Sequence, residues 1–385
     1  HRWFQGRWRH SFAGNVELIA SARAYEEKRG NGTPYTRNGT REKLLSFGLA
    51  GQPAEHFAWN GTAYVQDQSF ASTFSSVNAT RTAETPASDQ FAVPAVSLGA
   101  AWTGAWRHAS TARSSAGADL RTVRGETREN FTFTAGRFTR QRVAGGRQTF
   151  AGLFALHERP LAPELRLSFG ARLDSWHATD GHRRETDRNT GAGLRNDRYA
   201  SQQGTEFSPN AGLVWSPDRA WRVRANAQHA FRRPTLNELY RPFRQGPNVT
   251  EANPALRTER VTSGEIGTEW TYWGLTAQPV GWNPRRRFEP KPYAALVLGA
   301  TAFWNDLRDT VGNVTVARGP GTFPLVGTIA AGGVGRQRLN LDRIRVRGVE
   351  LSAAWRASET VSFKAAALFN DATVQRAAIA PALVG

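Results

Sequence analysis

The stretch TEFSPNAGLVWSPDRAWRVRANAQHAF, residues 205–231, decides the fold class of this chain. Apolar residues recur at every second position on both sides of a four-residue turn, Ser216-Pro217-Asp218-Arg219, with Pro209 as the one break in the first series. A period of two places alternate side chains on opposite faces of a β-strand, and a turn rich in Pro and Asp returns the chain antiparallel. The stretch therefore predicts a β-hairpin with one apolar face, formed by Phe207, Ala211, Leu213 and Trp215, then Trp221, Val223, Ala225, Ala227 and Phe231.

The same hairpin pattern recurs along the whole chain. It predicts fourteen strands, near 2–10, 14–26, 42–51, 55–69, 93–107, 115–127, 148–158, 164–178, 204–215, 220–231, 260–273, 292–306, 343–355 and 361–374. Short turns alternate with long polar connections, which fall near 27–41, 70–92, 128–147, 179–203, 232–260 and 307–342. The one poor fit is 274–291, a long connection where a short one is expected. All short turns should then lie at one end of the strands and all long loops at the other.

This sorting of connections by length favours a membrane barrel over a soluble all-β fold. One rim of such a barrel carries tight turns and the opposite rim carries long loops. Strands of about ten residues also match the length that a tilted strand needs to cross a bilayer, and they exceed the usual five or six of soluble sheets. We therefore expect an all-β transmembrane antiparallel β-barrel with short periplasmic turns and long extracellular loops, and no helix longer than about three turns. A propeller or a jelly roll is the soluble alternative.

Hydropathy and aromatic residues agree with a barrel. The mean hydropathy is −0.51 and no run of eighteen apolar residues occurs, so the sequence contains no candidate transmembrane helix. Low mean hydropathy is expected when apolar residues occupy only alternate positions. Eleven of the 13 tryptophans cluster near the expected strand ends, as an aromatic girdle would require, although any single one also fits ordinary packing.

The net charge of +18 raises the question of nucleic-acid binding. Arginines are spread over loops and polar strand faces instead of forming one basic module, so we expect no nucleic-acid partner. Two interpretations of the charge stay open: a solvated lumen and loop surface, or attraction of anionic lipopolysaccharide or an anionic ligand. The run Arg285-Arg286-Arg287 falls on the short-turn side, where a solvated turn is expected.

Catalytic and metal-binding patterns are missing from the sequence. The chain has no cysteine, which excludes disulfides, thiolate metal sites and thiol nucleophiles. His157-Glu158 lacks the second histidine of a zincin helix, and the glycine-rich pieces 191–193 and 332–335 follow no βα unit. No nucleophile elbow and no P-loop lysine occurs. We therefore expect neither an enzyme nor a bound metal or cofactor.

Residues 231–259, FRRPTLNELYRPFRQGPNVTEANPALRTE, carry a more specific signal. A strand ends in Phe-Arg-x-Pro-Thr, the loop contains Asn-Pro-x-Leu-x-x-Glu, and the next strand opens with Glu-x-Gly. This combination resembles the barrel of TonB-dependent outer-membrane receptors, and 340–375 resembles a late strand pair of the same barrel. The motif residues have structural roles available to them, since Pro234 ends a strand and Asn253 before Pro254 favours a turn. They are Phe231, Arg232, Pro234, Thr235, Asn253, Pro254, Leu256, Glu259, Glu265 and Gly267.

The resemblance implies a larger protein than this chain. Barrels of the family have twenty-two strands around an N-terminal plug, so 1–385 is expected to be a partial barrel domain, an interior piece that lacks the plug and the C-terminal strands. It also implies uptake of a scarce siderophore, haem or cobalamin-like ligand, powered by the TonB-ExbB-ExbD complex, in the bacterial outer membrane among lipid and lipopolysaccharide. A passive porin or an adhesin-type barrel is the alternative, which a plug and a coupling box upstream would exclude.

Two expectations concern individual side chains. Val349, Leu351, Ala353 and Trp355 should face lipid with Phe363, Ala365 and Ala367, whereas Arg345, Arg347, Glu350 and Ser352 should face the lumen, with Gly348 as a possible bulge between the two sets. The loop 232–260 gathers arginine and aromatic residues beyond a strand end, which suits a bulky anionic or planar ligand. Its candidate ligand residues are Tyr240, Arg241, Phe243 and Arg244, and the alternative is a loop that only braces the rim.

Overall fold

The computed structural model describes residues 1–109, 111–279, 288–358 and 360–385, and these ranges are almost entirely β-structure. Fourteen long strands are present in the described ranges: β1 (Arg2–Phe12), β2 (Val16–Gly30), β3 (Arg37–Ala54), β4 (Phe57–Val77), β5 (Glu84–Arg107), β6 (Arg113–Thr134), β7 (Arg137–Ala162), β8 (Leu165–Asp187), β10 (Gln202–Trp215), β11 (Trp221–Arg232), β14 (Glu259–Pro279), β15 (Phe288–Arg318), β18 (Val334–Arg356) and β19 (Ser362–Arg376). The predicted strand count is therefore confirmed for the described residues.

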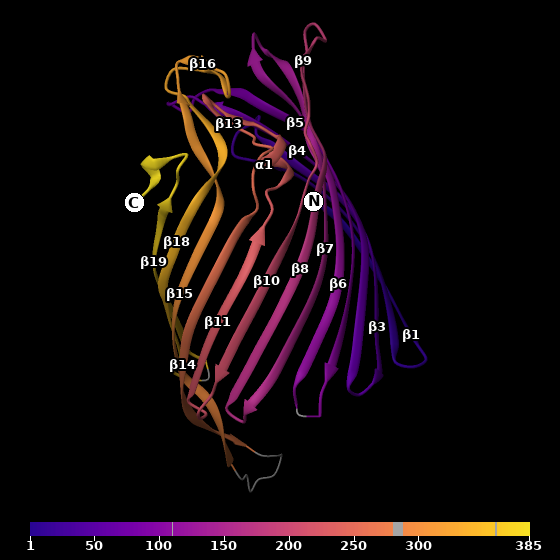
Figure 1. The fold of residues 1–385 in the computed structure, drawn as a ribbon, viewed down its shortest axis with the longest axis vertical. Helices are drawn as coiled ribbons and strands as arrows, with labels where there is room; N and C mark the ends of the chain where they lie inside the picture. The colour runs from indigo at the N-terminus through magenta and orange to yellow at the C-terminus, as the bar shows by residue number, and fades with distance from the viewer. Residues whose placement is uncertain (110, 280–287, 359) are drawn as a thin grey trace.

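The long strands form one antiparallel ladder that follows chain order. Registers join each strand to the next one along the series from β1 through β8, then β10, β11, β14, β15, β18 and β19. No register joins β1 to β19 within the described ranges. The ladder curves into a wall with all its strands tilted the same way (Figure 1). Because every member pairs with its sequence neighbour, the wall has the up-and-down topology expected of a membrane-type barrel.

The two ends of this wall differ, although not as the sequence predicted in detail. At the lower end in Figure 1 the turns are short, for example 13–15, 55–56 and 163–164. At the upper end the long connections are mostly strand: β2 and β3 extend to within six residues of each other, and so do β4 and β5. The expected loop 128–147 is instead a tight hairpin, whose Ala135 and Gly136 have φ of 50° and 77°. Two consecutive positive φ values are typical of a hairpin turn that matches strand twist.

The physical reason for this difference is that strands of a hairpin keep pairing with each other after they leave the lipid. Both of their faces then meet polar surroundings, so the alternation that marks a strand in the sequence disappears. The connection 274–291 is also partly strand, because β14 continues to Pro279 and β15 begins at Phe288. The remaining residues 280–287, with Arg285-Arg286-Arg287, lie outside the described residues.

One face of the wall is apolar across the strands. Leu351 pairs with Ala300 on β15 and Ala367 on β19, and the same face continues through Ile266, Ala225, Leu213 and Leu167. The predicted apolar set on β18 and β19 therefore shares one face, and Glu350 and Ser352 lie on the other. This apolar face is the outer, lipid-facing side of the wall.

The prediction that Arg345 and Arg347 face the lumen is wrong. The register between β18 and β19 runs without a shift from Ile344 to Arg356, so Arg347 lies on the same face as Val349. Gly348 forms no bulge that would reverse the alternation. Arg347 pairs instead with Asp371 directly opposite, at 3.2 Å, and both side chains are exposed. Charged residues on the outer face cost little near the end of the apolar band, where water and headgroups begin.

Buried apolar clusters occur at the upper end of the wall rather than along it. One contains Ala144, Leu239, Tyr240 and Leu256, and a second contains Val249, Ala317, Val326 and Ile329. The segments that form them include α1 (Leu236–Tyr240) and the short strands β13 (Asn248–Glu251), β16 (Gly321–Phe323) and β17 (Gly327–Ile329). Two further short strands are β9 (Gly193–Arg198) and β12 (Phe243–Gln245).

Helices are short throughout the described ranges. Besides α1 there is one 3-10 helix, η1 (Pro381–Leu383), so the predicted limit of three turns is confirmed for these residues. None of the described helices is long and apolar enough to span a membrane.

Candidate functional site

The connection between β11 and β14 runs across the inner side of the wall instead of projecting from its rim. We call residues 233–258 the crossing segment. Its helix α1 packs against β7 and β8, its strand β12 approaches β4 and β5, and β13 pairs in parallel with β18 through Val249 and Gly335. The crossing segment lies within the curve of the wall in Figure 1. It therefore joins strands that are far apart in the ladder, close to the upper opening.

The helix α1 starts at a complete capping box. Thr235 is the N-cap, its side chain accepts a hydrogen bond from the backbone N–H of Glu238, and the Glu238 carboxylate accepts one from the Thr235 backbone N–H at 2.7 Å. Arg232 donates two hydrogen bonds of 3.0 Å to Glu238 and also bonds Glu259. Burial alone would raise the pKa of Glu238, but the bonds from Arg232 and Thr235 outweigh it and lower that pKa. A capping box satisfies two otherwise unpaired backbone donors.

The Asn-Pro-x-Leu motif fixes the far end of the crossing segment. Asn253 donates from Nδ2 to the carbonyl of Arg338 at 3.0 Å and accepts from the backbone N–H of Ala255 at 2.9 Å. Leu256 is fully buried beside Tyr240. The carbonyls of the two motif prolines accept from glutamine side chains: Gln148 bonds Pro234, and Gln202 bonds Pro254.

The remaining motif residues lie on the strands that flank the segment. Phe231 pairs with Arg260 across β11 and β14, and Glu265 pairs with Asn226 on the inner face. A Cβ on Gly267 would lie 2.7 Å from Oγ1 of Thr301, so glycine allows the close approach there.

Tyr240 fills a notch in the wall that two glycines create. Its ring stacks on Tyr199, with centroids 5.2 Å apart and planes 13° apart, and the side chain is almost completely buried. A Cβ on Gly146 would lie 2.9 Å from the ring, and one on Gly181 would lie 2.6 Å from it. The wall can therefore accept this tyrosine only because both positions lack a side chain.

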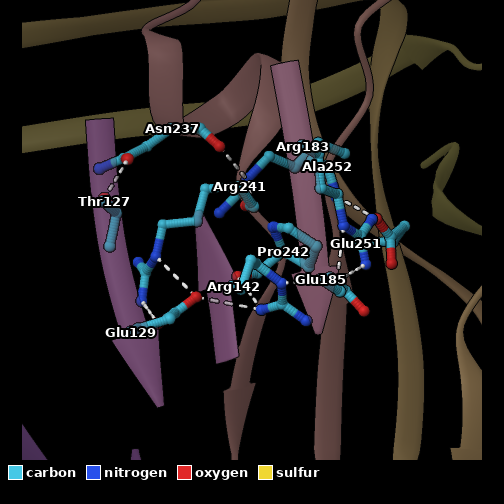
Figure 2. Close-up of polar contacts among 11 residues, drawn as sticks. Thr127, Glu129, Arg142, Arg183, Glu185, Asn237, Arg241, Pro242, Glu251 and Ala252 are labelled. Atoms are coloured by element: carbon cyan, nitrogen blue, oxygen red, sulfur yellow. Dashed lines mark hydrogen bonds and ion pairs between the residues drawn. The ribbon is translucent and has the colours of Figure 1, made fainter. Parts of the chain in front are cut away.

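A chain of alternating charges connects the crossing segment to β6, β7 and β8 (Figure 2). Glu129 accepts from Arg241 at 2.6 Å and from Arg142 at 3.0 Å. Arg142 also bonds Glu185 at 2.7 Å, and the chain continues from Glu185 to Arg183 and on to Glu251. These six side chains are largely buried. Three cations match three anions, so none of these six buried charges is left unpaired.

Two other arginines of the crossing segment, Arg233 and Arg244, have no carboxylate partner among the described residues, whereas Arg257 pairs with Asp309. Arg233 lies 3.7 Å from the centre of the Trp176 ring and bonds Gln202 and Thr258. Arg244 donates to the carbonyl of Thr328 at 3.0 Å. Burial lowers the pKa of Arg233, and burial together with repulsion from Arg142 lowers the pKa of Arg244. These desolvated cations make the crossing segment electropositive.

The four candidate ligand residues occupy different surroundings. Tyr240 is enclosed in its notch, and Arg241 is buried against Glu129. Phe243 is partly buried, with its ring edge-on to Phe74 at 6.3 Å, and Arg244 is partly buried without an anionic partner in the described part of the chain.

Sequence reasoning missed the partners of these residues on the wall, Glu129, Arg142, Arg183 and Glu185. They lie in stretches that read as polar loops, and no spacing in the sequence links them to Arg241.

The fold and the crossing segment define a membrane-type barrel wall with part of its own chain folded across its inner side near one opening. Residues 2–382 match the family model described as "TonB dependent receptor-like, beta-barrel". The chain belongs to that family, as the motif in 231–267 predicted. No curated protein matches it.

Several solved structures share the fold. The copper transporter OprC has 14% identity and a TM-score of 0.69, covering 97% of this chain and 53% of that one. The hemophore receptor HasR of Serratia marcescens, solved with its hemophore HasA and heme, has 15% identity and a TM-score of 0.67, covering 96% and 54%. The ferric yersiniabactin uptake receptor FyuA of Yersinia pestis has 11% identity and a TM-score of 0.63, covering 94% and 50%. The chain spans about half the length of these structures.

Proposed function

We propose that the whole protein is a bacterial outer-membrane receptor that takes up a scarce ligand with energy coupled through TonB. The observation that carries this proposal is the family match over 2–382. Solved relatives of the same fold include proteins named as transporters or receptors of copper, heme with its hemophore, and ferric yersiniabactin. Their names define the range of cargo to test: metal ions, siderophore complexes and haem, to which the motif resemblance adds cobalamin.

The crossing segment favours a gated receptor over a passive pore. A diffusion channel needs an open aqueous path through its lumen. Here the segment is tied to β6–β8 by buried ion pairs, to β18 by a parallel strand pairing and to β4 by the contact of Phe243 with Phe74. A segment held at so many points restricts the opening without any ligand present. The porin alternative therefore has less support than energised uptake.

We further propose that the ligand meets the protein at the crossing segment. Phe243 and Arg244 would contact it, because they are only partly buried and Arg244 has no anionic partner in the described ranges. Tyr240 and Arg241 would position them, since both side chains are anchored to the wall and β12, which carries Phe243 and Arg244, begins two residues after Arg241. A cation beside an aromatic ring suits an anionic or planar cargo, through charge-assisted hydrogen bonds and stacking.

The proposed function is tested by uptake in cells that carry the full-length gene. Labelled ferric siderophores, haem, cobalamin and Cu²⁺ are supplied singly to cells with and without a functional TonB protein. We expect accumulation of one ligand class that requires both the receptor and TonB. Equal accumulation in the two strains would support the porin alternative. Surface binding of a protein or carbohydrate with no uptake would support the adhesin alternative.

A further inference from the structure

Two arginines face each other directly on the outer, lipid-facing side of the wall. Arg124 on β6 and Arg147 on β7 are register partners in the antiparallel ladder, and both side chains are exposed. They lie on the same face as the apolar pair Leu120 and Ala151, four register positions away along the two strands. Like charges directly opposite each other on neighbouring strands destabilise a sheet. The pair therefore destabilises the sheet locally unless an anion lies beside it.

The protein itself supplies little negative charge beside these two arginines. Arg124 forms no ion pair or side-chain hydrogen bond with any described residue, and its other register neighbour is Val96. The Nε atom of Arg147 is 3.7 Å from Asp180, whose side chain is well exposed, and such a surface pair contributes little.

The nearest acidic residue along β6 on the same face, Glu126, is already engaged by Arg128 at 2.5 Å and by His182 at 3.3 Å. The positive charge of the two arginines is thus largely uncompensated within the described part of the chain.

The height of the pair on the wall identifies what surrounds it. Along the outer face of β6, Ser114 lies near the short-turn end, hydrogen-bonded to His157, and ten residues separate it from Arg124. A strand rises about 3.3 Å per residue, and barrel strands tilt by roughly 40°. Ten residues therefore span about 25 Å along the membrane normal, which is about the height of the apolar band of a membrane barrel. Arg124 and Arg147 lie at the upper border of that band, where lipid headgroups begin.

We propose that Arg124 and Arg147 form a binding site for the phosphate group of an anionic lipid in the membrane leaflet at the long-loop end. Each planar guanidinium can donate two parallel hydrogen bonds to phosphate oxygens. One phosphate between the two side chains would replace their mutual repulsion by charge-assisted bonds to both. The acyl chains would then lie along the apolar face below, past Leu120 and Leu153. The proposal concerns the outer wall and is independent of the transported ligand.

The test uses the full-length receptor, purified in detergent and titrated with dihexanoyl phosphatidic acid, with dihexanoylglycerol as the same lipid without phosphate. Bound lipid is counted by native mass spectrometry. The variant is Arg124→Gln with Arg147→Gln. The matched control is Arg121→Gln, which removes one positive charge from the same strand but on the inner face, where Arg121 stacks on Phe150. A change in electrophoretic migration on heating, equal to that of the wild type, verifies that each variant is folded.

We expect the wild type and Arg121→Gln to bind the phosphate lipid at least fivefold more tightly than the glycerol lipid. We expect the double variant to lose that preference. Equal binding of phosphatidic acid by the double variant and the wild type would overturn the proposal, and so would equal binding of the two lipids by the wild type. Displacement of the lipid by an equal concentration of inorganic phosphate would also overturn it, because the ligand would then be a free anion rather than a membrane lipid.

Discussion

Arg241 donates a 2.6 Å hydrogen bond to Glu129, a residue 112 positions earlier in the chain, and this contact fastens the crossing segment to the barrel wall. Both side chains are buried, and Glu129 also accepts from Arg142. The pair is one end of the alternating charge chain that reaches Glu251, a residue of the same segment. The crossing segment is thus tied to the wall at two separate points by a single network.

Replacing Arg241 by Gln should destabilise the receptor, because Glu129 would lose one of its two cations in a buried position. We expect a loss of about 2 kcal/mol, below the roughly 3–5 kcal/mol typical of a fully broken buried pair, since Arg142 remains. Urea unfolding of the full-length protein in detergent measures it. The double variant Arg241→Gln with Glu129→Gln should recover part of the loss. A double variant less stable than the sum of the two single effects would contradict the pairing.

Replacing Gly181 by Ala should expel Tyr240 from its notch, because the new Cβ would lie 2.6 Å from the ring. Overpacking of this kind costs about 1–3 kcal/mol, and the crossing segment should become sensitive to added protease. The control is Gly193→Ala in β9, where no atom lies within 4 Å of the added Cβ. If Gly181→Ala and Gly193→Ala resist proteolysis equally, Tyr240 does not hold the segment.

Replacing Leu351 by Arg should impair folding into the membrane, because this residue lies within the apolar outer face. An arginine near the bilayer midplane costs about 2–4 kcal/mol on the lipid side. Leu368→Arg is the matched control, because Leu368 lies on the neighbouring strand opposite Glu350, on the inner face. The measurement is the folded fraction after refolding into lipid vesicles. Similar fractions for both variants would show that the two faces are wrongly assigned.

Replacing Arg244 by Ala should weaken ligand binding while leaving the barrel intact. Its guanidinium has no carboxylate partner in the described residues, and the pKa of the group is lowered by burial and by Arg142. An anionic ligand would relieve both effects, and the loss of one charge-assisted contact corresponds to about tenfold or more in affinity. Binding of the ligand identified by uptake is measured on intact cells. Unchanged affinity at equal surface expression would leave Arg244 with only a structural role.

The sequence was sufficient to predict the strand ladder, because the lipid imposes strict alternation on every strand that crosses it. Leu213, Ala225 and Ile266 recur with a period of two and indeed lie side by side on one face. The same argument failed at Arg347, where strand pairing continues beyond the apolar band and a charged residue occupies the outer face. Above that level, strand extensions and loops have similar polar sequences, so their boundaries could not be predicted.

The crossing segment shows a second limit of sequence reasoning. The motif in 231–259 was visible, and capping of α1 by Thr235 and Glu238 follows from their spacing. The partners of Arg241 were not, since contacts between residues more than a hundred positions apart leave no local pattern. The notch for Tyr240 depends on Gly146 and Gly181, and as sequence features these glycines look like ordinary loop residues.

The central claim is that this wall belongs to a gated, energised receptor rather than a passive pore. The most direct measurement is the ionic conductance of the full-length protein in a planar lipid bilayer, without ligand and without TonB. We predict no steady channel conductance, because the crossing segment is anchored on several sides by the Glu129 network, β18 and Phe74. A stable open conductance of porin size from the folded protein would contradict the account.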